Sequence, residues 1–201
     1  GRIERIGEPM ARIHHQAGPV HIDVTEPIAD YLMGTRAMLR LLTRVGEAPP
    51  LPGGTGELAG VGHRVVHGGE TFHDSVIIDE AAIAAIEAVS HLAPLHNPAN
   101  LEGIRAARRY IAHCPHVAVF DTAFFQTMPP RAYVYALPYE WYLERGIRRY
   151  GFHGTSHRYV AMVAAGLLGK NRPNLVTFHL GNGCSVACIE HGRAIDQSMG
   201  L

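Results

Sequence analysis

Histidines beside turns are the residues of this chain whose types and spacing first suggest chemistry. The 201-residue sequence contains 14 histidines. Those that stand next to turns instead of on periodic apolar faces are His63, His67, His96, His153, His157 and His179. Clustered histidines suggest a metal site. His153 and His157 have the spacing of a zinc-binding helix, but Gly154 stands where the metalloprotease motif has its glutamate. A metal-dependent hydrolase therefore stays open as an alternative with an incomplete motif.

Two glycine-containing segments can be compared with nucleotide-binding motifs, and both are incomplete. Gly169-Lys170 lacks the upstream glycine and the following serine or threonine of a P-loop. Gly181-Asn182-Gly183 lacks the third glycine of the dinucleotide fingerprint. The segment 181–185 could still expose backbone N–H groups to phosphate oxygens without obstruction by a Cβ atom. An ordinary hairpin turn is the other interpretation of this segment.

Composition and charge favour a small-molecule partner. Lys plus Arg and Asp plus Glu number 18 each, and 47% of the residues are hydrophobic, so we expect no nucleic-acid or membrane partner. No run approaches the roughly 18 apolar residues that cross a bilayer. The odd count of 3 cysteines argues against a disulfide framework and predicts a cytoplasmic location. The missing initiator Met and the turn-like end at Gly200 suggest a chain cut at both ends.

Strand and helix patterns alternate along the chain and predict an α/β architecture with a mixed sheet. The predicted helices are residues 27–46, 79–90, 97–113 and 155–169, and residues 48–60 are predicted to form a loop. The predicted strands are residues 61–66, 76–78, 117–120, 174–180 and 185–189. The short apolar strand 117–120 carries Asp121 at its carboxyl end, where open α/β sheets place groups that contact ligands.

Five segments, in this order, closely resemble signature segments of the acetate kinase family, which also includes propionate and butyrate kinases. They are GHRVVHGG (62–69), LAPLHNPANL (92–101), VFDTAF (119–124), YGFHGTSHRYV (150–160) and HLGNGCSVACI (179–189). Five motifs in one order are far more specific than any single motif. Two positions depart from the family pattern, because Phe125 replaces the usual histidine and Gln197 replaces the usual threonine.

The resemblance implies an actin-like ATPase (ribonuclease H-like) kinase fold with two α/β lobes. Residues 1–125 would form the first lobe without its amino-terminal strand, and residues 126–201 would form the opening part of the second lobe. Pro129-Pro130 interrupts the pattern near this change. The rest of the second lobe, with a second substrate arginine and a metal-side glutamate, would lie outside this chain.

The resemblance also implies which residues form the site. Phosphoryl transfer depends mainly on alignment and on neutralising charge. The implied catalytic residues are Arg64, which would bind the carboxylate or acyl phosphate, His153, which would stabilise the transition state, His96, and Asp121, which would lie near magnesium. The implied walls of the acyl pocket are Val66, Leu95 and Phe152. The implied nucleotide-phosphate segment is His179, Leu180, Gly181, Asn182 and Gly183.

The reaction that the resemblance implies is reversible phosphoryl transfer between ATP and acetate, which gives ADP and acetyl phosphate and uses Mg²⁺. The parent enzyme would be a cytoplasmic homodimer. A propionate or butyrate kinase of the same family is one alternative. A non-catalytic truncated fragment or nucleotide-binding module is another.

Overall fold

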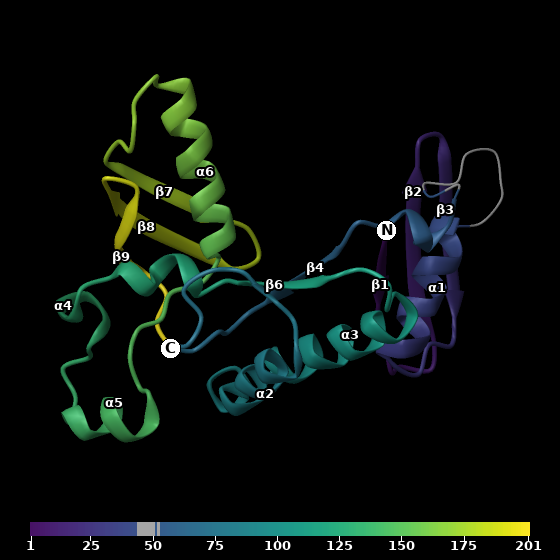
Figure 1. Cartoon of the computed structure of the whole chain (residues 1–201), viewed down its shortest axis with the longest axis horizontal. Coiled ribbons are helices and arrows are strands. Elements are labelled where there is room, and N and C mark those ends of the chain that lie inside the picture. The colour runs from purple at the N-terminus through teal and green to yellow at the C-terminus, as the bar shows by residue number, and fades with distance from the viewer. Residues whose placement is uncertain (44–50, 52) are drawn as a thin grey trace. The chain divides into compact units, whose positions relative to one another are not determined.

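The computed structural model describes residues 1–43, 51 and 53–201, which form two compact units (Figure 1). Unit 1 contains residues 1–61 and 99–116, and unit 2 contains residues 62–98 and 117–201. These two units do not test the predicted change of lobe after residue 125, which stays a prediction. Within the described part of the chain, no helix is long and apolar enough to span a membrane.

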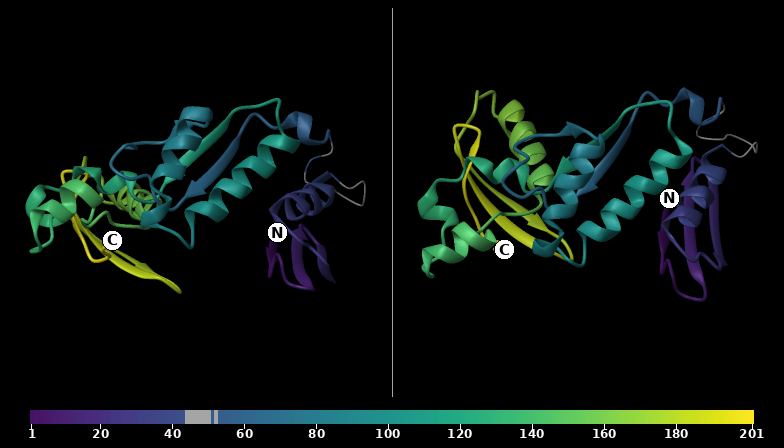
Figure 2. Two further views of the ribbon diagram at one scale, coloured as in Figure 1. Left: turned by 90° about the horizontal axis from the view of Figure 1, so that it is seen from below. Right: turned by 60° about the horizontal axis from the view of Figure 1, so that its bottom comes forward.

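Unit 1 is built on a three-stranded antiparallel sheet with the order β1 (Arg2–Glu4), β2 (Ala11–Ala17) and β3 (Val20–Glu26). Helix α1 (Tyr31–Thr43) lies along one face of this sheet (Figures 1 and 2). Its residues Ala37 and Leu41 share a buried cluster with Ala11 and Ile13 of β2. Unit 1 also holds the 3₁₀ turn η1 (Thr55–Glu57) and most of α3 (Asn97–Tyr110).

Helices α1 and α3 have boundaries that differ from the predicted ones. Helix α1 begins at Tyr31 instead of residue 27, because the Asp30 carboxylate accepts a hydrogen bond from Met33 N at 2.7 Å and caps the first turn. Its predicted end at residue 46, like part of the predicted loop 48–60, lies outside the described residues. Helix α3 ends at Tyr110 instead of residue 113. Pro115 follows closely, and the residue before a proline avoids helical geometry.

The first sheet of unit 2 carries parts of two segments that resemble the family motifs, 62–69 and 119–124. Its strands are β4 (Val61–Val65), β6 (His116–Phe120) and β5 (Val76–Ile77), in that order. Val65, Ala118 and Phe120 are buried, as expected for short apolar strands. The helix α2 (Glu80–Ala88) follows β5, and the Asp79 carboxylate caps it by accepting from Ala82 N at 2.7 Å. The turn η2 (Ser90–Leu92) then leads to the start of α3.

The second sheet of unit 2 is an antiparallel meander of β7 (Leu175–Leu180), β8 (Cys184–Glu190) and β9 (Arg193–Gln197). The predicted strands 174–180 and 185–189 and the hairpin at Gly181–Gly183 are confirmed, whereas β9 was not predicted. Helix α6 (Gly154–Leu167) packs against β7 (Figure 2). It begins one residue before the predicted start.

Between the two sheets of unit 2 the chain forms short helices. The 3₁₀ helix η3 (Ala123–Thr127) packs against β9, and Thr127 Oγ1 donates to Ala194 O at 2.8 Å. Pro129-Pro130 precedes and begins a short helix, because Pro130 occupies the first turn of α4 (Pro130–Tyr133), a position that suits proline. Helix α5 (Tyr139–Arg145) follows and ends at Gly146, which has a φ of 64°.

Candidate active site

A buried carboxylate and an exposed guanidinium form the centre of the candidate site. Asp121 follows the last residue of β6, and its N–H bonds to Val65 O of β4 at 3.0 Å. Arg64 of β4 donates to both carboxylate oxygens, from Nε at 2.9 Å and from Nη2 at 2.6 Å. The side chain of Asp121 is 2% exposed and that of Arg64 is 63% exposed. The hydrogen bond to Asp121 raises the pKa of Arg64. The pair is therefore a fixed fork with one side open to solvent.

The start of helix α6 is held directly against Asp121. The Gly154 N–H donates to Asp121 O at 2.9 Å. A Cβ atom on Gly154 would stand 2.3 Å from that oxygen, so only glycine fits here. His153 caps the helix with a φ of 61°, a left-handed conformation that non-glycine residues rarely adopt outside functional or strained positions. The local backbone thus places the His153 ring next to the Arg64–Asp121 pair.

Hydroxyl groups from the second sheet hold two imidazole rings of this region. His153 Nδ1 lies 2.9 Å from Ser185 Oγ, and His157 Nε2 lies 2.8 Å from the same oxygen. His157 Nδ1 lies 2.7 Å from Thr177 Oγ1. His157, Thr177 and Ser185 are all buried. The spacing His153–His157 on one helix therefore serves a hydrogen-bond network with β7 and β8.

The segment 179–183, which is predicted to bind the nucleotide phosphates, contacts His153. The ring of His179 stacks on that of His153 with centroids 4.1 Å apart and an angle of 24°. His179 Nδ1 lies 2.9 Å from Ser156 Oγ. A Cβ atom on Gly183 would stand 3.3 Å from His153 Nε2. The hairpin turn after β7 therefore reaches the histidine at the start of α6.

Burial disfavours the charged forms of His153, which precedes α6, and of His157 within α6. Burial lowers the pKa of His153, and the neighbouring His179 lowers it further, while Asp121 acts in the opposite direction. Burial also lowers the pKa of His157 to about 4, with His153 and His179 adding to the effect. Each ring therefore carries a single N–H group at pH 7, which donates from one nitrogen and leaves the other as an acceptor.

The loop after β4 is fixed by groups that the sequence did not single out. Asn97 accepts from His67 N at 3.0 Å and donates to His67 O at 2.9 Å. Thr122 Oγ1 accepts from Gly68 N at 3.0 Å. The His67 ring lies edge-on to Phe152 with centroids 5.7 Å apart, and burial lowers the pKa of His67 to about 4. This loop thereby brings the residue after Val66 next to Phe152.

The structure brings together part of the predicted site. Arg64 pairs with Asp121, His153 stacks on His179, and the turn Gly181–Gly183 approaches the His153 ring at Gly183. Asp121 and Arg64 lie close enough to His153 to affect its pKa. Leu95 and His96 lie in the exposed turn before α3, with Leu95 86% exposed. Among the described residues, the side chain of His96 has no hydrogen-bond partner. Leu180 and Asn182 are exposed. The individual roles of all these residues stay predictions.

The donor set suits magnesium with a nucleotide better than zinc. Both ring nitrogens of His157 are occupied by hydroxyl groups, and the described part of the chain contains no cluster of three His, Cys, Asp or Glu residues able to hold a metal. Asp121 is the one buried acidic residue in the described ranges. Mg²⁺ bound with phosphates commonly takes only one or two carboxylates from the protein. Arg64 uses two of the roughly four lone-pair sites of Asp121 and leaves the others free.

The motif order and this geometry agree with a comparison over the whole chain, since residues 1–201 match the model of the Acetokinase family. The chain belongs to the acetokinase family. Membership in this kinase family excludes the metal-dependent hydrolase that the histidine count suggested.

Known acetokinases resemble this chain in sequence and in structure. The acetate kinase of Thermotoga maritima is 50% identical over 205 residues and matches 100% of this chain and 50% of its own length. A crystal structure of Porphyromonas gingivalis acetate kinase has a TM-score of 0.92 at 41% identity, covering 98% of this chain and 50% of that one. A propionate kinase from Francisella tularensis has a TM-score of 0.87 at 38% identity, with the same coverage.

These likenesses confirm the predicted fold. The chain has an α/β structure that corresponds to part of the actin-like kinase fold. It spans about half the length of the acetokinases it matches.

Proposed function

We propose that this acetokinase transfers a phosphoryl group reversibly between ATP and acetate, giving ADP and acetyl phosphate. The observation that carries the proposal is the Arg64–Asp121 fork beside His153 at the start of α6. The guanidinium can neutralise anionic charge, the buried carboxylate can orient the guanidinium and hold Mg²⁺, and the neutral imidazole can donate a hydrogen bond, which are tasks that phosphoryl transfer requires.

Arg64 would bind the oxygens of acetate or acetyl phosphate. A guanidinium has five N–H donors, and Asp121 accepts from Nε and Nη2. The remaining donors can bind substrate oxygens while Asp121 keeps the fork in place. The exposed side chain of Arg64 presents these donors to solvent. In this arrangement Asp121 positions the arginine in addition to any contact with the metal.

His153 would donate a hydrogen bond to the phosphoryl group during its transfer. Its neutral ring carries one N–H group, and the backbone N–H groups at the start of α6 add positive potential nearby. Bound Mg²⁺, held by Asp121, would neutralise charge on the nucleotide phosphates. In the predicted phosphate segment, Gly181 N already donates to Gly183 O at 3.2 Å. Other groups of the segment 179–183 would therefore contact the phosphates.

The acyl group would lie against Val66, Phe152 and Leu95, which offer apolar walls for a methyl group. Propionate is the second candidate acid, because one structural neighbour is a propionate kinase. Butyrate would need a still larger pocket. The ratio of the specificity constants for the three acids decides among them.

The remaining properties of the whole enzyme are proposals by family likeness. We infer a cytoplasmic homodimer that uses ATP and ADP with Mg²⁺ and binds neither nucleic acid nor membrane. The balanced charge of the chain supports the absence of these two partners. We also propose that residues 1–125 and 126–201 belong to two different lobes and that His96 approaches the acyl phosphate when substrates bind.

The test uses the protein encoded by the complete reading frame that contains residues 1–201. Acetyl phosphate formation from ATP, Mg²⁺ and acetate is trapped as the hydroxamate, with propionate and butyrate in parallel. We expect Arg64→Gln to lower kcat/KM for acetate about 100-fold, the usual loss when one charged donor is removed. Arg158→Gln is the matched control, since Arg158 is an exposed arginine paired with Asp74. Absence of acyl phosphate with every acid, or full activity of Arg64→Gln, would refute the proposal.

A further inference from the structure

A chain of hydrogen bonds joins the core of unit 2 to His153. It runs from Thr177 Oγ1 to His157 Nδ1 at 2.7 Å and from His157 Nε2 to Ser185 Oγ at 2.8 Å. The last step joins Ser185 Oγ to His153 Nδ1 at 2.9 Å. Thr177, His157 and Ser185 are 4%, 1% and 1% exposed. Each hydroxyl has one hydrogen and two acceptor lone pairs, and each neutral imidazole has one hydrogen, so few arrangements of the hydrogens satisfy every bond of the chain.

Two directions use the hydroxyl hydrogen of Ser185 within the chain. In a third arrangement Ser185 would accept from both rings, and its buried hydroxyl hydrogen would then have no acceptor among the described residues. In the first, Thr177 donates to His157 Nδ1, His157 Nε2–H donates to Ser185, and Ser185 donates to His153 Nδ1. The single hydrogen of the His153 ring is then on Nε2. In the second, every donor and acceptor is exchanged, His153 carries its hydrogen on Nδ1, and its Nε2 is a bare acceptor.

The burial of Thr177 favours the first direction. Its hydroxyl has no hydrogen-bond partner besides His157 in the described part of the chain. In the second direction the hydroxyl hydrogen of Thr177 would be buried without an acceptor, which costs about 1 to 3 kcal/mol. In the first direction every hydrogen of the three buried side chains is used. Only Nε2 of His153 then faces away from the network, toward the turn at Gly183.

We propose that Ser185 is a positioning residue that donates to Nδ1 of His153 and so holds His153 in the tautomer with its hydrogen on Nε2. The hydrogen bond from Thr177 to His157 determines which group donates in each later bond of the chain. The inference rests on the proposed function in one respect, which is the role of His153 as a donor to the phosphoryl group. The opposite tautomer would turn an acceptor lone pair toward anionic phosphate oxygens and would oppose transfer.

Tautomer control matters whenever the ring is neutral, because a neutral imidazole has one hydrogen and its position decides whether Nε2 donates or accepts. The charged or titratable groups around the ring are His157 on its own helix, His179 of β7, Arg64 of β4 and Asp121 after β6. Within the described part of the chain, Nδ1 of His153 hydrogen-bonds to Ser185 alone.

The decisive experiment measures the tautomer directly in the 201-residue protein. Long-range ¹H–¹⁵N NMR spectra of protein with ¹⁵N-labelled histidines separate protonated from bare ring nitrogens at pH 7. We expect protonated Nε2 and bare Nδ1 in both His153 and His157. A hydrogen on Nδ1 of His153 in the unmodified protein would overturn the proposal, whatever any variant does.

Three variants test the path by which the tautomer is set. Thr177→Val removes the hydroxyl with little change of shape and should leave both His157 and His153 as mixtures of tautomers, whereas Thr177→Ser should restore the native pattern. Ser185→Ala should produce a mixture at His153 alone. Ser156→Ala is the matched control, because it removes the hydroxyl on His179 and should leave the tautomer of His153 unchanged. An unchanged His153 tautomer in folded Ser185→Ala and Thr177→Val proteins would contradict the path.

The catalytic consequence has a separate measurement. In the enzyme from the complete reading frame, Ser185→Ala should lower kcat about 10-fold or more while the KM values for acetate and ATP stay unchanged, since groups that fix a catalytic tautomer act on turnover. If the NMR result holds and the enzyme transfers no phosphoryl group, the proposed function fails and the tautomer assignment stands. If transfer occurs with the Nδ1–H tautomer, the positioning role fails and the function stands.

Discussion

Gly154 and Asp121 are joined through their backbones, with Gly154 N 2.9 Å from Asp121 O and no room for a side chain between them. This contact sets the start of α6 against the end of β6. It therefore fixes the distance between the His153 ring and the Arg64–Asp121 fork without using any side chain of the candidate site.

Gly154→Ala is the first test of this contact. The added Cβ would stand 2.3 Å from a backbone oxygen that cannot rotate away, so we expect a loss of about 3 kcal/mol in the free energy of unfolding, the upper part of the range for overpacking. Urea unfolding followed by the fluorescence of Trp141, the single tryptophan, measures the loss in unit 2.

Gly166→Ala provides the control within the same helix. A Cβ on Gly166 meets nothing within 4 Å, and alanine is favoured over glycine inside a helix by about 0.5 to 1 kcal/mol. This variant should therefore be more stable than the unmodified protein. Equal stability of the two variants would show that the Gly154–Asp121 contact does not constrain the helix start.

A second prediction concerns acid stability and the buried imidazole of His157. Its pKa of about 4 in the folded protein lies below the ordinary value of 6.5. Between these two pH values, His157 is protonated in the unfolded chain and neutral in the folded protein. Stability should therefore be fully present above about pH 6.5 and fall as the pH decreases toward 4, by up to about 3 kcal/mol for this group. His67, with a pKa of about 4, should act in the same direction.

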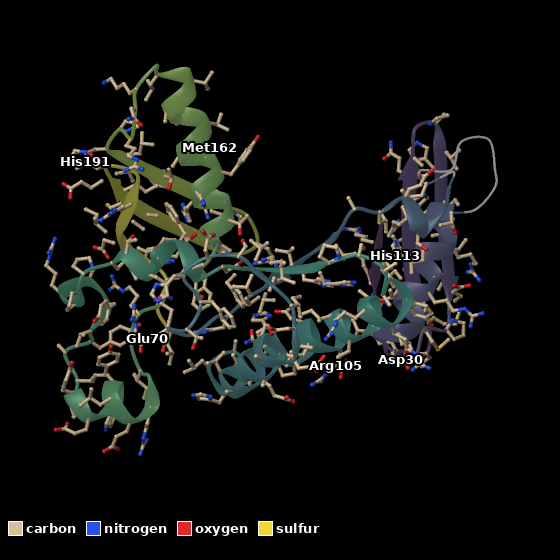
Figure 3. All side chains as sticks on the ribbon, viewed as in Figure 1. Asp30, Glu70, Arg105, His113, Met162 and His191 are labelled. Carbon is tan, nitrogen blue, oxygen red and sulfur yellow. The ribbon has the colours of Figure 1, made fainter. Side chains whose placement is uncertain are left out.

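The comparison of variants isolates the contribution of His157. His157→Gln should flatten the slope of stability against pH between about 4.5 and 6.5, measured by urea unfolding with Trp141 fluorescence. His113→Gln alters an exposed histidine of unit 1 (Figure 3) and should leave the slope as it is. A slope that His157→Gln does not reduce would contradict the lowered pKa.

A third prediction concerns Arg148, a buried cation outside the proposed site. Its side chain is 4% exposed and pairs with the half-exposed Glu70, which Figure 3 labels. The guanidinium carbon lies 3.7 Å from the centroid of the Tyr133 ring. Planar stacking on an aromatic face suits arginine and not lysine.

We therefore expect Arg148→Ala to destabilise unit 2 by about 2 kcal/mol, because it removes the stacking on Tyr133 and leaves space where a buried side chain stood. Arg148→Lys should recover only part of this loss because an ammonium group cannot stack in the same way. The control is Arg158→Ala, whose exposed pair with Asp74 should contribute at most about 0.5 kcal/mol. Urea unfolding measures all three, and equal effects at Arg148 and Arg158 would contradict the stacking argument.

The sequence predicted the elements whose patterns are local. The apolar strands β7 and β8 and the glycine turn between them were predicted from residue types alone, and so was Asp121 at the end of β6. The strands of unit 1 were not predicted. The inward positions of β2 are Ala11, Ile13 and His15, and a buried histidine among them weakens the apolar alternation that identifies a strand.

The candidate site could be predicted as a set of residues but not as a set of contacts. Resemblance to the family selected Arg64, Asp121 and His153 without indicating that the first two form a fork across 57 positions of sequence. Thr177 was not selected, and Ser185 was considered only as the last residue of the turn segment 181–185, because hydroxyl residues at inward strand positions are common and their partners come from a distant helix. Only the folded register of β7 and β8 against α6 brings them to His157.

The last prediction concerns the choice of acid and uses two adjacent valines of opposite orientation. Val65 is fully buried in the sheet, whereas Val66 is only partly buried and precedes the fixed loop near Phe152. Removing two methyl groups from a pocket wall makes room for a larger substrate, and one methylene in an apolar pocket changes discrimination by about 10-fold or more. Val66→Ala should therefore shift the ratio of kcat/KM for propionate over acetate upward by about 10-fold in the enzyme from the complete reading frame. Val65→Ala should instead lower stability by about 2 kcal/mol, as core truncations do, and leave the ratio unchanged. A ratio that stays constant in Val66→Ala would show that this valine serves packing alone and that the acyl pocket is formed by other residues.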